Sequence, residues 1–543
     1  MKRIIYFMGI MISLSGFFSC TKDLNRTPNN GITSDSALSN YAGYQQLFAK
    51  VYGSYGLTGP SYGGNDLQSI TNGDYVDFLR DWFNLQENPT DESICAWNDP
   101  GITDIDYISW GASTLWTNAL YYRLYYQIAV CNEFIRQAAD ATVASHGITG
   151  TNATEIKYMQ TEARFIRAFD YWVLMDAYAN PPFVTDKDPV GSYIPPQISR
   201  ANLFNWVATE LKTIDPLLKT PKSNDYGRAD QAAEWALLAR MYLNANVYNG
   251  TNNTKYYDSA ITYSSKIISA GYSLNSNFQA LFTADNNKNN PEIILPIVYD
   301  GNTGPTWGGT TFIINSSFGG DTKAASATYL GITGGNDGWG GNRSRPNLPN
   351  LFASGDNRAK FTGSGASTKN QIDAVQTFTD GLPVWKFTNK NADGTTPAAA
   401  SQDPAFCSAD FPLFRLGEQY LIYAEAVLRG GNGGSMAQAI SYINTLRQRA
   451  YGNTNGNVTS LTLQQGVAGS ICSIIDERAR EMYWECQRRT DLVRFGLFTS
   501  SSYVWPWKGG SANGVGVNSI YNIYPIPASD LSVNLNLKQN TGY

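Results

Sequence analysis

Apolar residues recur at steps of three and four positions through two long stretches of the chain. In residues 113–141 the series comprises Leu120, Leu124, Ile128, Cys131 and Ile135. In residues 156–177 it comprises Ile156, Met159, Ala163, Ile166, Phe169, Val173 and Ala177, and it is followed by Asn180, Pro181 and Pro182. This spacing is that of an amphipathic helix, and the prolines mark a helix end. We therefore predict two long helices.

Three shorter series with the same spacing follow. Their apolar positions are Leu203, Val207, Leu211, Ile214 and Leu218, then Ala232, Ala236, Ala239 and Leu243, then Tyr256, Ala260, Tyr263 and Ile267. Small alanines on one helix can face large side chains on the next. This arrangement predicts stacked helix pairs of the tetratricopeptide kind.

The C-terminal third returns to helical spacing, over residues 416–427, 440–446 and 464–494. Between the two helical parts, residues 300–412 are rich in Gly, Ser, Thr and Asn, with only short alternating runs such as residues 310–315. We predict loops and small strands there, inserted into a helical scaffold of about residues 113–270 and 413–495. The expected fold class is mostly α, a single large domain with a loop-rich irregular half. Insertions of this size usually carry the binding site.

The N-terminus reads as an export signal. Lys2 and Arg3 precede an apolar run over residues 4–14, and Cys20 follows a small residue. This run is too short to span a bilayer. We predict a lipoprotein signal peptide over residues 1–19 with lipidation of Cys20, the alternative being ordinary secretion. Residues 21–23 resemble the signals that direct bacterial lipoproteins to the cell surface, so the expected location is the outer membrane.

Composition removes several classes of function. The net charge is -5 with 16% charged residues, so no basic face for nucleic acid is indicated. His146 is the single histidine, which argues against a zinc site or a histidine-based triad. After Cys20 an odd number of cysteines remains, so at least one thiol stays free. The 13 Trp and 34 Tyr require a large core or a surface that stacks on a ligand.

Acidic residues are densest near the C-terminus. Asp476, Glu477, Glu481, Glu485 and Asp491 alternate with five arginines. A glycosidase would need two carboxylates on either side of a sugar bond. The helical spacing of opposite charges favours instead a solvated or packed face of ion pairs.

The stretch "DNNKNNPE" offers oxygen ligands at alternating positions. Asp285, Asn287, Asn289 and Glu292 could surround a calcium ion. The stretch lacks the glycine and the acidic density of a full calcium loop. An Asn-rich turn is therefore the favoured interpretation, with a structural calcium at Asp285 and Asn287 as the alternative.

Three tryptophans lie in loops flanked by glycine or small polar residues. They are Trp97, Trp307 and Trp339. A loop tryptophan usually packs back onto its own domain, but three in glycine-rich settings indicate ring faces left open to a flat ligand. Sugars present such a face, and their hydroxyl groups need polar partners at its edge. Arg80, Asn98 and Asp99 are close to Trp97 in sequence and are the candidate partners.

Several ordered blocks resemble a known family. Among them are "RDWFNLQENPTDESICAW", "EARFIRAFDYWVLMDAY", "GRADQAAEWALLARMYLNANVY", "PLFRLGEQYLIYAEAVLR" and "YPIPASDLSVNLNLKQNTGY". They resemble the SusD/RagB family over residues 24–543. The resemblance implies one domain over residues 20–543, with tetratricopeptide-like pairs on one side and a loop-rich half holding the ligand site. It also implies a lipoprotein that captures glycans without cleaving them and needs no cofactor.

The same resemblance implies partners and a ligand. The partners are a TonB-dependent, SusC-like transporter, other surface glycan-binding lipoproteins and an amylase. The founding member of the family binds starch through an arc of aromatic rings with an arginine and an asparagine. Trp97 and Trp339 match two of the rings, Trp307 stands where that protein has a tyrosine, and Arg80 matches the arginine. The asparagine position falls at Pro100, for which Asn98 and Asp99 are the candidate substitutes. The segment of Asp285 resembles that member's metal-binding region.

The expected function is thus binding of starch or malto-oligosaccharides at the cell surface and delivery to the transporter. One alternative is a family member that binds another cargo, such as a β-glycan, a fructan or a peptide. The other is a helical glycoside hydrolase.

Overall fold

The computed structural model describes residues 34–543 apart from 60–63, 68–74, 320–325, 327, 333–337, 363–368 and 468. The predicted signal peptide and Cys20 lie outside the described residues. Within the described ranges, no helix has the length and apolar character needed to cross a membrane.

The helices and strands are distributed along the whole chain. In chain order they are α2 (Ser34–Ala37), α3 (Tyr41–Gly56), α4 (Phe78–Gln86), β1 (Ile94–Cys95), α5 (Ile102–Tyr107), α6 (Leu115–Gln137), α7 (Asp140–Ser145), α8 (Gly150–Tyr178), α9 (Arg200–Ile214), α10 (Gln231–Leu243), α11 (Ala245–Asn249), α12 (Lys255–Ile268), β2 (Ile293–Ile297), α13 (Gly309–Ser316), β3 (Asn342–Arg343), β4 (Phe411–Arg415), α15 (Leu416–Leu428), α16 (Met436–Tyr451), β5 (Ser460–Thr462), β6 (Ile471–Ser473), α17 (Ile474–Met482), α18 (Arg488–Arg494) and α19 (Ala528–Val533).

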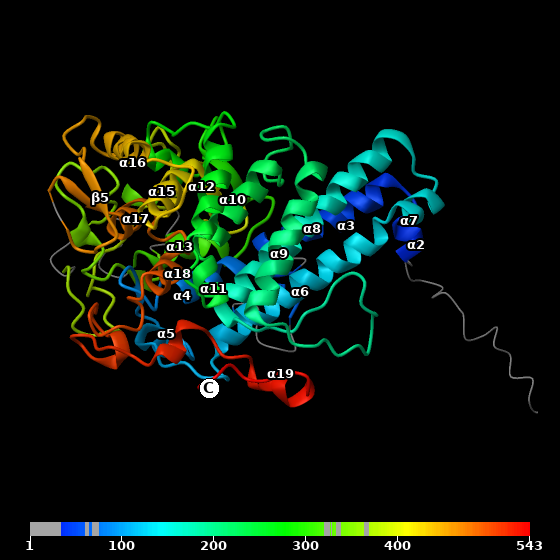
Figure 1. The fold of residues 1–543 in the computed structure, drawn as a ribbon, viewed down its shortest axis with the longest axis horizontal. Helices are drawn as coiled ribbons and strands as arrows, with labels where there is room; N and C mark the ends of the chain where they lie inside the picture. The colour runs from blue at the N-terminus through cyan, green and yellow to red at the C-terminus, as the bar shows by residue number, and fades with distance from the viewer. Residues whose placement is uncertain are drawn as a thin grey trace, which may run out of the picture.

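The two long helices predicted from the sequence are confirmed as α6 and α8. They pack against each other, and α8 also packs against α9 (Figure 1). α8 ends at Tyr178, just before the Asn-Pro-Pro stop signal. Its second half is buried almost all round, as expected for a helix in the centre of a large protein.

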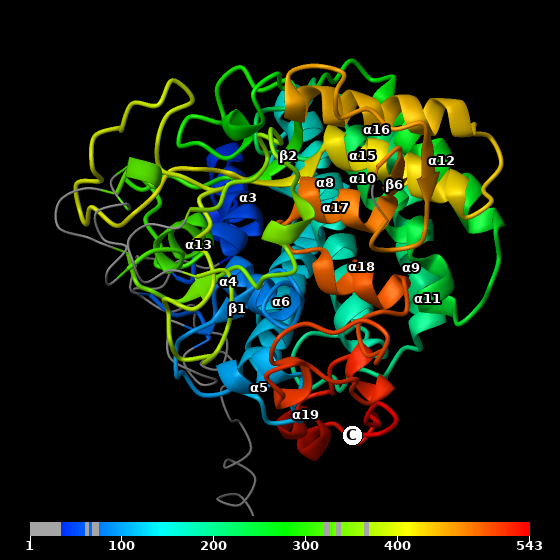
Figure 2. The same ribbon diagram turned by 90° about the vertical axis from the view of Figure 1, so that its left-hand side faces the viewer.

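The alanine-rich series forms α10. The side chain of Asp230 caps it by accepting hydrogen bonds from the backbone N–H groups of Ala232 and Ala233, at 2.9 and 3.2 Å. Its small buried residues let α12 approach, and α12 packs on α15, which packs on α16. These stacked pairs confirm the mostly α fold class. Figure 2 shows them on the right, with the loop-rich part of the chain on the left.

One predicted helix is divided in two. The prediction of a continuous helix over residues 464–494 is wrong, because β6, α17 and α18 occupy this stretch. Trp484 and Cys486, between α17 and α18, have φ values of 62° and 59°, which a right-handed helix cannot contain. The Trp484 ring is 1% exposed and lies edge-on to Phe83 at 5.2 Å. Burial of this indole therefore outweighs the helical spacing of the sequence.

The loop-rich part contains small strands, as expected, but also a helix. The prediction of a strand at residues 310–315 is wrong, since α13 covers them. Every residue of α13 is buried, so neither helical nor strand periodicity could show in the sequence. The pairs β1–β3 and β2–β4 are antiparallel and join segments more than a hundred residues apart, whereas β5–β6 is parallel.

The charged C-terminal cluster is packed rather than solvated. The guanidinium group of Arg415 pairs with Glu292, Glu481 and Glu485 at 2.7–3.1 Å, and all four side chains are at most 1% exposed. A buried arginine needs such compensation for its charge. The ion-pair interpretation is confirmed, and the network joins α17 to the β2–β4 pair.

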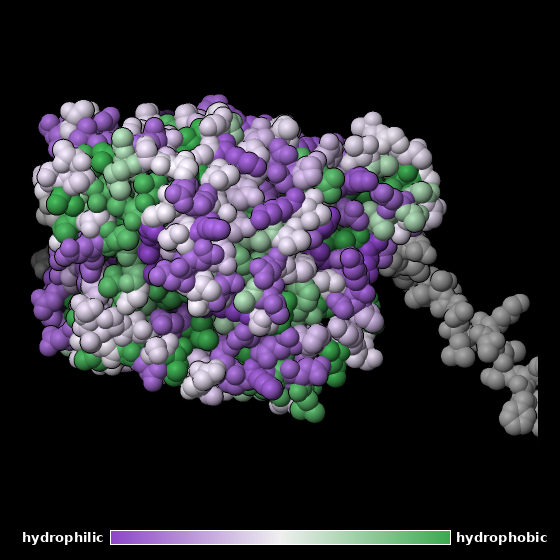
Figure 3. All heavy atoms as spheres, in the orientation of Figure 1, coloured by the Kyte–Doolittle hydropathy of each residue, from purple (hydrophilic) through white to green (hydrophobic). Residues whose placement is uncertain are grey.

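Figure 3 shows how hydrophobic and hydrophilic residues are distributed on one face of the molecule. On the face drawn in Figure 3, hydrophobic residues lie in small groups among hydrophilic ones. Within the described ranges, the free cysteines Cys95, Cys131, Cys407, Cys472 and Cys486 are all buried. This agrees with the prediction that at least one thiol is unpaired.

Candidate functional site

The start of α4 places Arg80. The carboxylate of Asp77 caps the helix by accepting the backbone N–H of Arg80 at 2.9 Å, and it also accepts the N–H of Gly309 at 2.9 Å. A Cβ on Gly308 would lie 1.9 Å from the Asp77 carboxyl carbon, so only glycine allows this approach. Burial raises the pKa of Asp77, against these hydrogen bonds. Asp77 thus joins the helix that carries Arg80 to the loop that carries Trp307.

A two-residue strand pair brings Trp97 and Trp339 together. Cys95 pairs with Asn342, and the N–H of Ala96 donates to the carbonyl of Gly341 at 2.9 Å. Just beyond the pair, the indole N–H of Trp97 donates to the backbone carbonyl of Trp339 at 3.1 Å. Antiparallel pairing therefore sets the spacing of two rings that the sequence separates widely.

The sequence predicts that glycine leaves the tryptophan faces open, but Gly341 instead lets the backbone pack closely against Trp97. A Cβ on Gly341 would lie 2.5 Å from the indole of Trp97, so the glycine lets the backbone pack against the ring. The ring also lies 5.9 Å from Phe312. Trp97 remains half-buried. Glycine here orients the ring rather than only leaving its face open.

Trp307 adds a third ring. Its centroid is 6.1 Å from that of Trp339, and the two planes are inclined at 51°. Phe406 supports it from 4.5 Å. Because the planes are inclined, these rings form a bent surface rather than a flat one.

These residues surround an open hollow of about 390 Å³. Its lining consists of Arg80, Trp97, Asn98, Asp99 and Trp339. Five of the six residues predicted for glycan binding therefore line one hollow, and the sixth, Trp307, does not line it but lies next to Trp339.

The polar groups of the hollow are held in place by aromatic side chains, of which only Trp97 was indicated by the sequence. The guanidinium carbon of Arg80 lies 5.0–5.7 Å from the ring centroids of Tyr75, Trp97, Trp116 and Phe312. Such cation–π contacts orient the charge. The hydroxyl group of Tyr75 also donates to the Asp99 carboxylate at 3.2 Å.

Pro100 and its neighbours form a turn at the surface next to Trp97. Pro100 and Asn98 are exposed, and Asp99 is half-buried. Pro100 offers no side-chain donor. Asn98 and Asp99, which line the hollow, are therefore the polar groups of this turn that a ligand can meet.

The half-buried tryptophans differ in whether their indole N–H groups donate a hydrogen bond within the protein. Seven tryptophans are half-buried, namely Trp97, Trp206, Trp235, Trp307, Trp339, Trp385 and Trp507. The N–H groups of three of them donate within the protein, and that of Trp385 is buried. Within the described residues, Trp206, Trp307 and Trp339 donate no such bond. Two of these three belong to the candidate site.

Two of the predicted calcium ligands make other contacts within the protein. One carboxylate oxygen of Asp285 accepts the N–H of Ala392 at 2.8 Å, while Glu292 is buried in an ion pair with Arg415. The side chain of Asn287 points to solvent. In the part of the chain that the structure describes, no group of three or more His, Cys, Asp or Glu side chains could hold a metal. The calcium site remains a prediction, and an Asn-rich turn accounts for the observed contacts.

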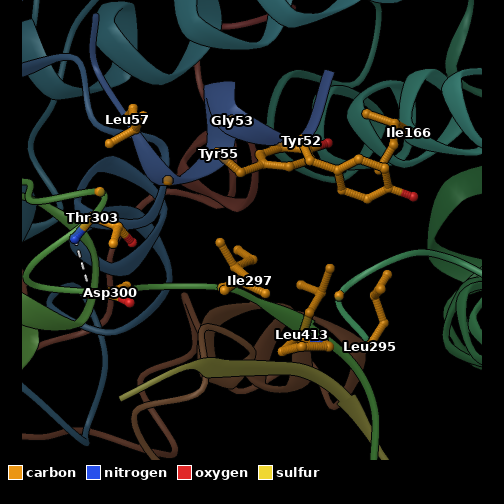
Figure 4. A pocket seen from close by; sticks show the side chains of 15 residues that line it. Tyr52, Gly53, Tyr55, Leu57, Ile166, Leu295, Ile297, Asp300, Thr303 and Leu413 are labelled. Atoms are coloured by element: carbon orange, nitrogen blue, oxygen red, sulfur yellow. Dashed lines mark hydrogen bonds between the residues drawn. The ribbon is translucent and has the colours of Figure 1, made fainter. Parts of the chain in front are cut away.

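A smaller cavity of about 240 Å³ lies between α3 and β2. Figure 4 shows Tyr52, Tyr55 and Ile166 on one side and Leu295, Ile297 and Leu413 on the other. The Asp300 carboxylate at its end accepts the backbone N–H of Thr303 at 3.1 Å and so stabilises its own turn. The lining is mainly apolar, and its carboxylate already accepts a hydrogen bond from its own turn. The cavity therefore does not suit the many hydroxyl groups of a sugar.

Comparison with known sequences identifies the family of the chain. The model of the SusD family matches residues 236–543. The chain is 35% identical to the starch-binding protein SusD of Bacteroides thetaiotaomicron, over 98% of this chain and 97% of that protein. It is 24% identical to the SusD-like protein P25 of Formosa agariphila, over 71% of this chain and 73% of that protein.

Comparison with solved structures shows the same fold. The surface glycan-binding protein A of Bacteroides uniformis superposes with a TM-score of 0.67 at 20% identity, covering 92% of this chain and 99% of that one. The surface glycan-binding protein A of Bacteroides thetaiotaomicron, in complex with laminarihexaose, superposes with a TM-score of 0.65 at 19% identity, with coverage of 92% and 99%.

Proposed function

Because the chain belongs to the SusD family, we propose that it is a cell-surface lipoprotein that binds starch-type α-glucans without cleaving them. The observation that carries the proposal is the hollow formed by Trp97, Trp339 and Arg80. A relative that is 35% identical over nearly the whole chain is a starch-binding protein, which supports starch as the ligand. The inclined rings suit the coil of an α-1,4 chain better than a flat β-glucan.

The size of the aromatic surface suits capture and release. Each half-exposed indole can cover roughly 80–100 Å² of apolar sugar surface, worth about 2 kcal/mol at about 25 cal/mol per Å². Three rings give about 6–7 kcal/mol before association and ordering costs remove several kcal/mol. The remainder, about 3–4 kcal/mol, corresponds to dissociation constants between roughly 1 and 10 mM. A ligand bound this weakly dissociates readily and can be released to a transporter.

Binding without cleavage agrees with the acidic groups at the site. Among the described residues that line the hollow, Asp99 is the single carboxylate. Glycoside hydrolysis by the usual mechanisms needs a second one on the opposite side of the sugar bond. We therefore place this chain with the binding proteins rather than with the hydrolases.

Lipidation of Cys20 and transfer to a TonB-dependent, SusC-like transporter complete the proposal. Both are supported by the resemblance of the sequence to its family. Replacement of Cys20 by Ala should release the protein from the membrane fraction. Mild solubilisation of native outer membranes should recover the transporter together with this chain, and its absence from the recovered material would contradict that partnership.

The ligand is tested by calorimetric titration with maltoheptaose, cellohexaose and laminarihexaose. We expect maltoheptaose to bind at least tenfold more tightly than either β-glucan. Tighter binding of laminarihexaose would reassign the glycan. A reducing-end assay with amylose should release no sugar, and release of sugar would overturn the binding-only role.

A further inference from the structure

A second hollow, of about 490 Å³, lies between α8, α9 and the segment that follows α8. Residues that line it include Gln160, Arg164, Phe183, Thr185, Trp206 and Glu210. α9 is well separated from α4 and α13 in both ribbon views, and from β1 in Figure 2 (Figures 1 and 2). The second hollow is therefore distinct from the site described above.

Trp206 is the aromatic surface of this hollow. Phe183 and Tyr171 meet its ring nearly at right angles, at centroid distances of 4.9 and 5.3 Å. The guanidinium carbon of Arg167 lies 5.5 Å from the ring centroid. These contacts hold the indole in one orientation although it is half-buried.

Trp206 shares the feature that marks Trp307 and Trp339. Its indole N–H donates no hydrogen bond to the described part of the chain, and it is not buried. Gln160, on the facing helix, uses its amide N–H to bond the carbonyl of Ile135 at 2.9 Å. No protein donor to its amide oxygen is found among the described residues. One donor and one acceptor are therefore open in the same hollow.

Four of the five charged side chains that line the hollow pair with one another, whereas Lys187 is exposed and has no ion pair among the described residues. Arg164 binds Glu210 through two hydrogen bonds of 2.7 and 2.8 Å. Arg167 pairs with Asp186 at 2.5 Å and with Glu210 at 3.0 Å. The ion pairs fix both arginines and take up their charge, so Lys187 is the one unpaired cation among the described lining residues. Fixed and mutually neutralised polar groups next to an aromatic face suit a neutral, polyhydroxylated ligand.

We propose that the hollow of Trp206 is a second glycan-binding site, which takes a neutral hexopyranose chain. The choice of an α-glucan as that chain rests on the proposed function. Two separated sites on one protein let a long polymer bind at both, so that its apparent affinity exceeds that of a short oligosaccharide without new contacts.

The test resolves the two sites in one titration. The protein is labelled with 5-fluorotryptophan, and the fluorine signals of Trp97, Trp339, Trp206 and Trp235 are assigned by single Trp→Phe replacements. Maltoheptaose is then added up to about 10 mM, the weak end of the range expected for such sites. We expect the Trp206 signal to shift saturably, both in the natural protein and in a Trp339→Ala variant. In Gln160→Ala the dissociation constant reported by Trp206 should rise at least threefold, with that reported by Trp97 unchanged.

Trp235 is the matched control, because it is also half-buried but donates its N–H to Asp215 at 2.9 Å. Its signal should stay fixed. If Trp97 and Trp339 shift while Trp206 does not, the second site is overturned and the proposed function stands. A Trp206 shift that disappears in Trp339→Ala also overturns it, since the effect is then indirect. Fixed signals at all three positions overturn the proposed function itself.

Discussion

The indole N–H of Trp97 donates a hydrogen bond of 3.1 Å to the backbone carbonyl of Trp339, 242 residues away in sequence. The bond extends the pairing of Cys95 with Asn342. Each ring is therefore positioned by the segment that carries the other. A change in either segment should alter the aromatic surface as a whole.

Replacement of Gly341 by Ala should weaken glucan binding. The new Cβ would lie 2.5 Å from the indole of Trp97 and would push the ring out of place. We expect a loss of about tenfold in affinity, equivalent to about 1.4 kcal/mol, and a loss of about 1–3 kcal/mol in stability because the added methyl group overpacks a buried position. Gly111→Ala is the control, because its Cβ meets nothing within 4 Å. Equal affinity of both variants for maltoheptaose would show that the contact does not set the ring position.

Replacement of Asp77 by Ala should reduce both stability and binding. It removes the cap of α4 and the hydrogen bond to Gly309, which together should cost about 1–3 kcal/mol in the free energy of unfolding. Asp77→Asn keeps a cap acceptor and avoids burial of a charge, so it should lose less. Urea unfolding measures the first effect and calorimetric titration the second. A fully stable Asp77→Ala variant would contradict the assigned link between α4 and α13.

Replacement of Pro100 by Asn should strengthen glucan binding. The exposed turn next to Trp97 would regain a side-chain donor at the position where the family resemblance places one. One added hydrogen bond of about 0.5–1.5 kcal/mol corresponds to roughly a twofold to tenfold gain. Pro100→Ala separates this effect from the loss of the proline ring. If both variants bind alike, Asn98 and Asp99 already fulfil the role.

Stability at low pH should depend on Glu425. Burial alone would raise its pKa, but the charges of Arg494, Arg429 and Arg478 outweigh burial and lower the pKa to about 2. A carboxyl group whose pKa is lower in the folded state contributes stability above its unfolded pKa of about 4.5. That contribution, here about 3 kcal/mol, is lost as the pH falls from about 5 to about 2.

The test compares Glu425→Gln with the natural protein by urea unfolding at several pH values. We expect the variant to be about 3 kcal/mol less stable at pH 7 and the difference to narrow steadily below pH 5. Asp225→Asn is the control, because that side chain is 79% exposed in its ion pair with Arg228. A difference that does not change with pH would contradict the assignment.

The sequence predicted the helical scaffold well, because its evidence is local. The spacing of Ile156 to Ala177 and the prolines after it are enough to locate α8. The break between α17 and α18 was missed because its cause, the burial of Trp484, depends on residues distant in sequence. α13 was mistaken for a strand because it is buried on every side.

The candidate site was predicted in part. Loop settings with glycine or small polar residues indicated Trp97, Trp307 and Trp339, and closeness to Trp97 in sequence together with the family resemblance indicated Arg80. The sequence did not indicate the residues that support them, namely Tyr75, Phe312 and Phe406. An aromatic residue in the core and one behind a binding site look alike in sequence. The sequence did not indicate Trp206 either, because an aromatic residue on a regular helix is usually part of the core.

Titration of maltoheptaose into Trp97→Ala, Trp339→Ala and Trp235→Ala tests the central claim most directly. Trp235 is half-buried on α10, outside the site, and serves as the matched control. Loss of a ring worth about 2 kcal/mol should weaken binding roughly thirtyfold in each of the first two variants. Trp235→Ala should bind as the natural protein does. Unchanged affinity in Trp97→Ala and Trp339→Ala would contradict the account.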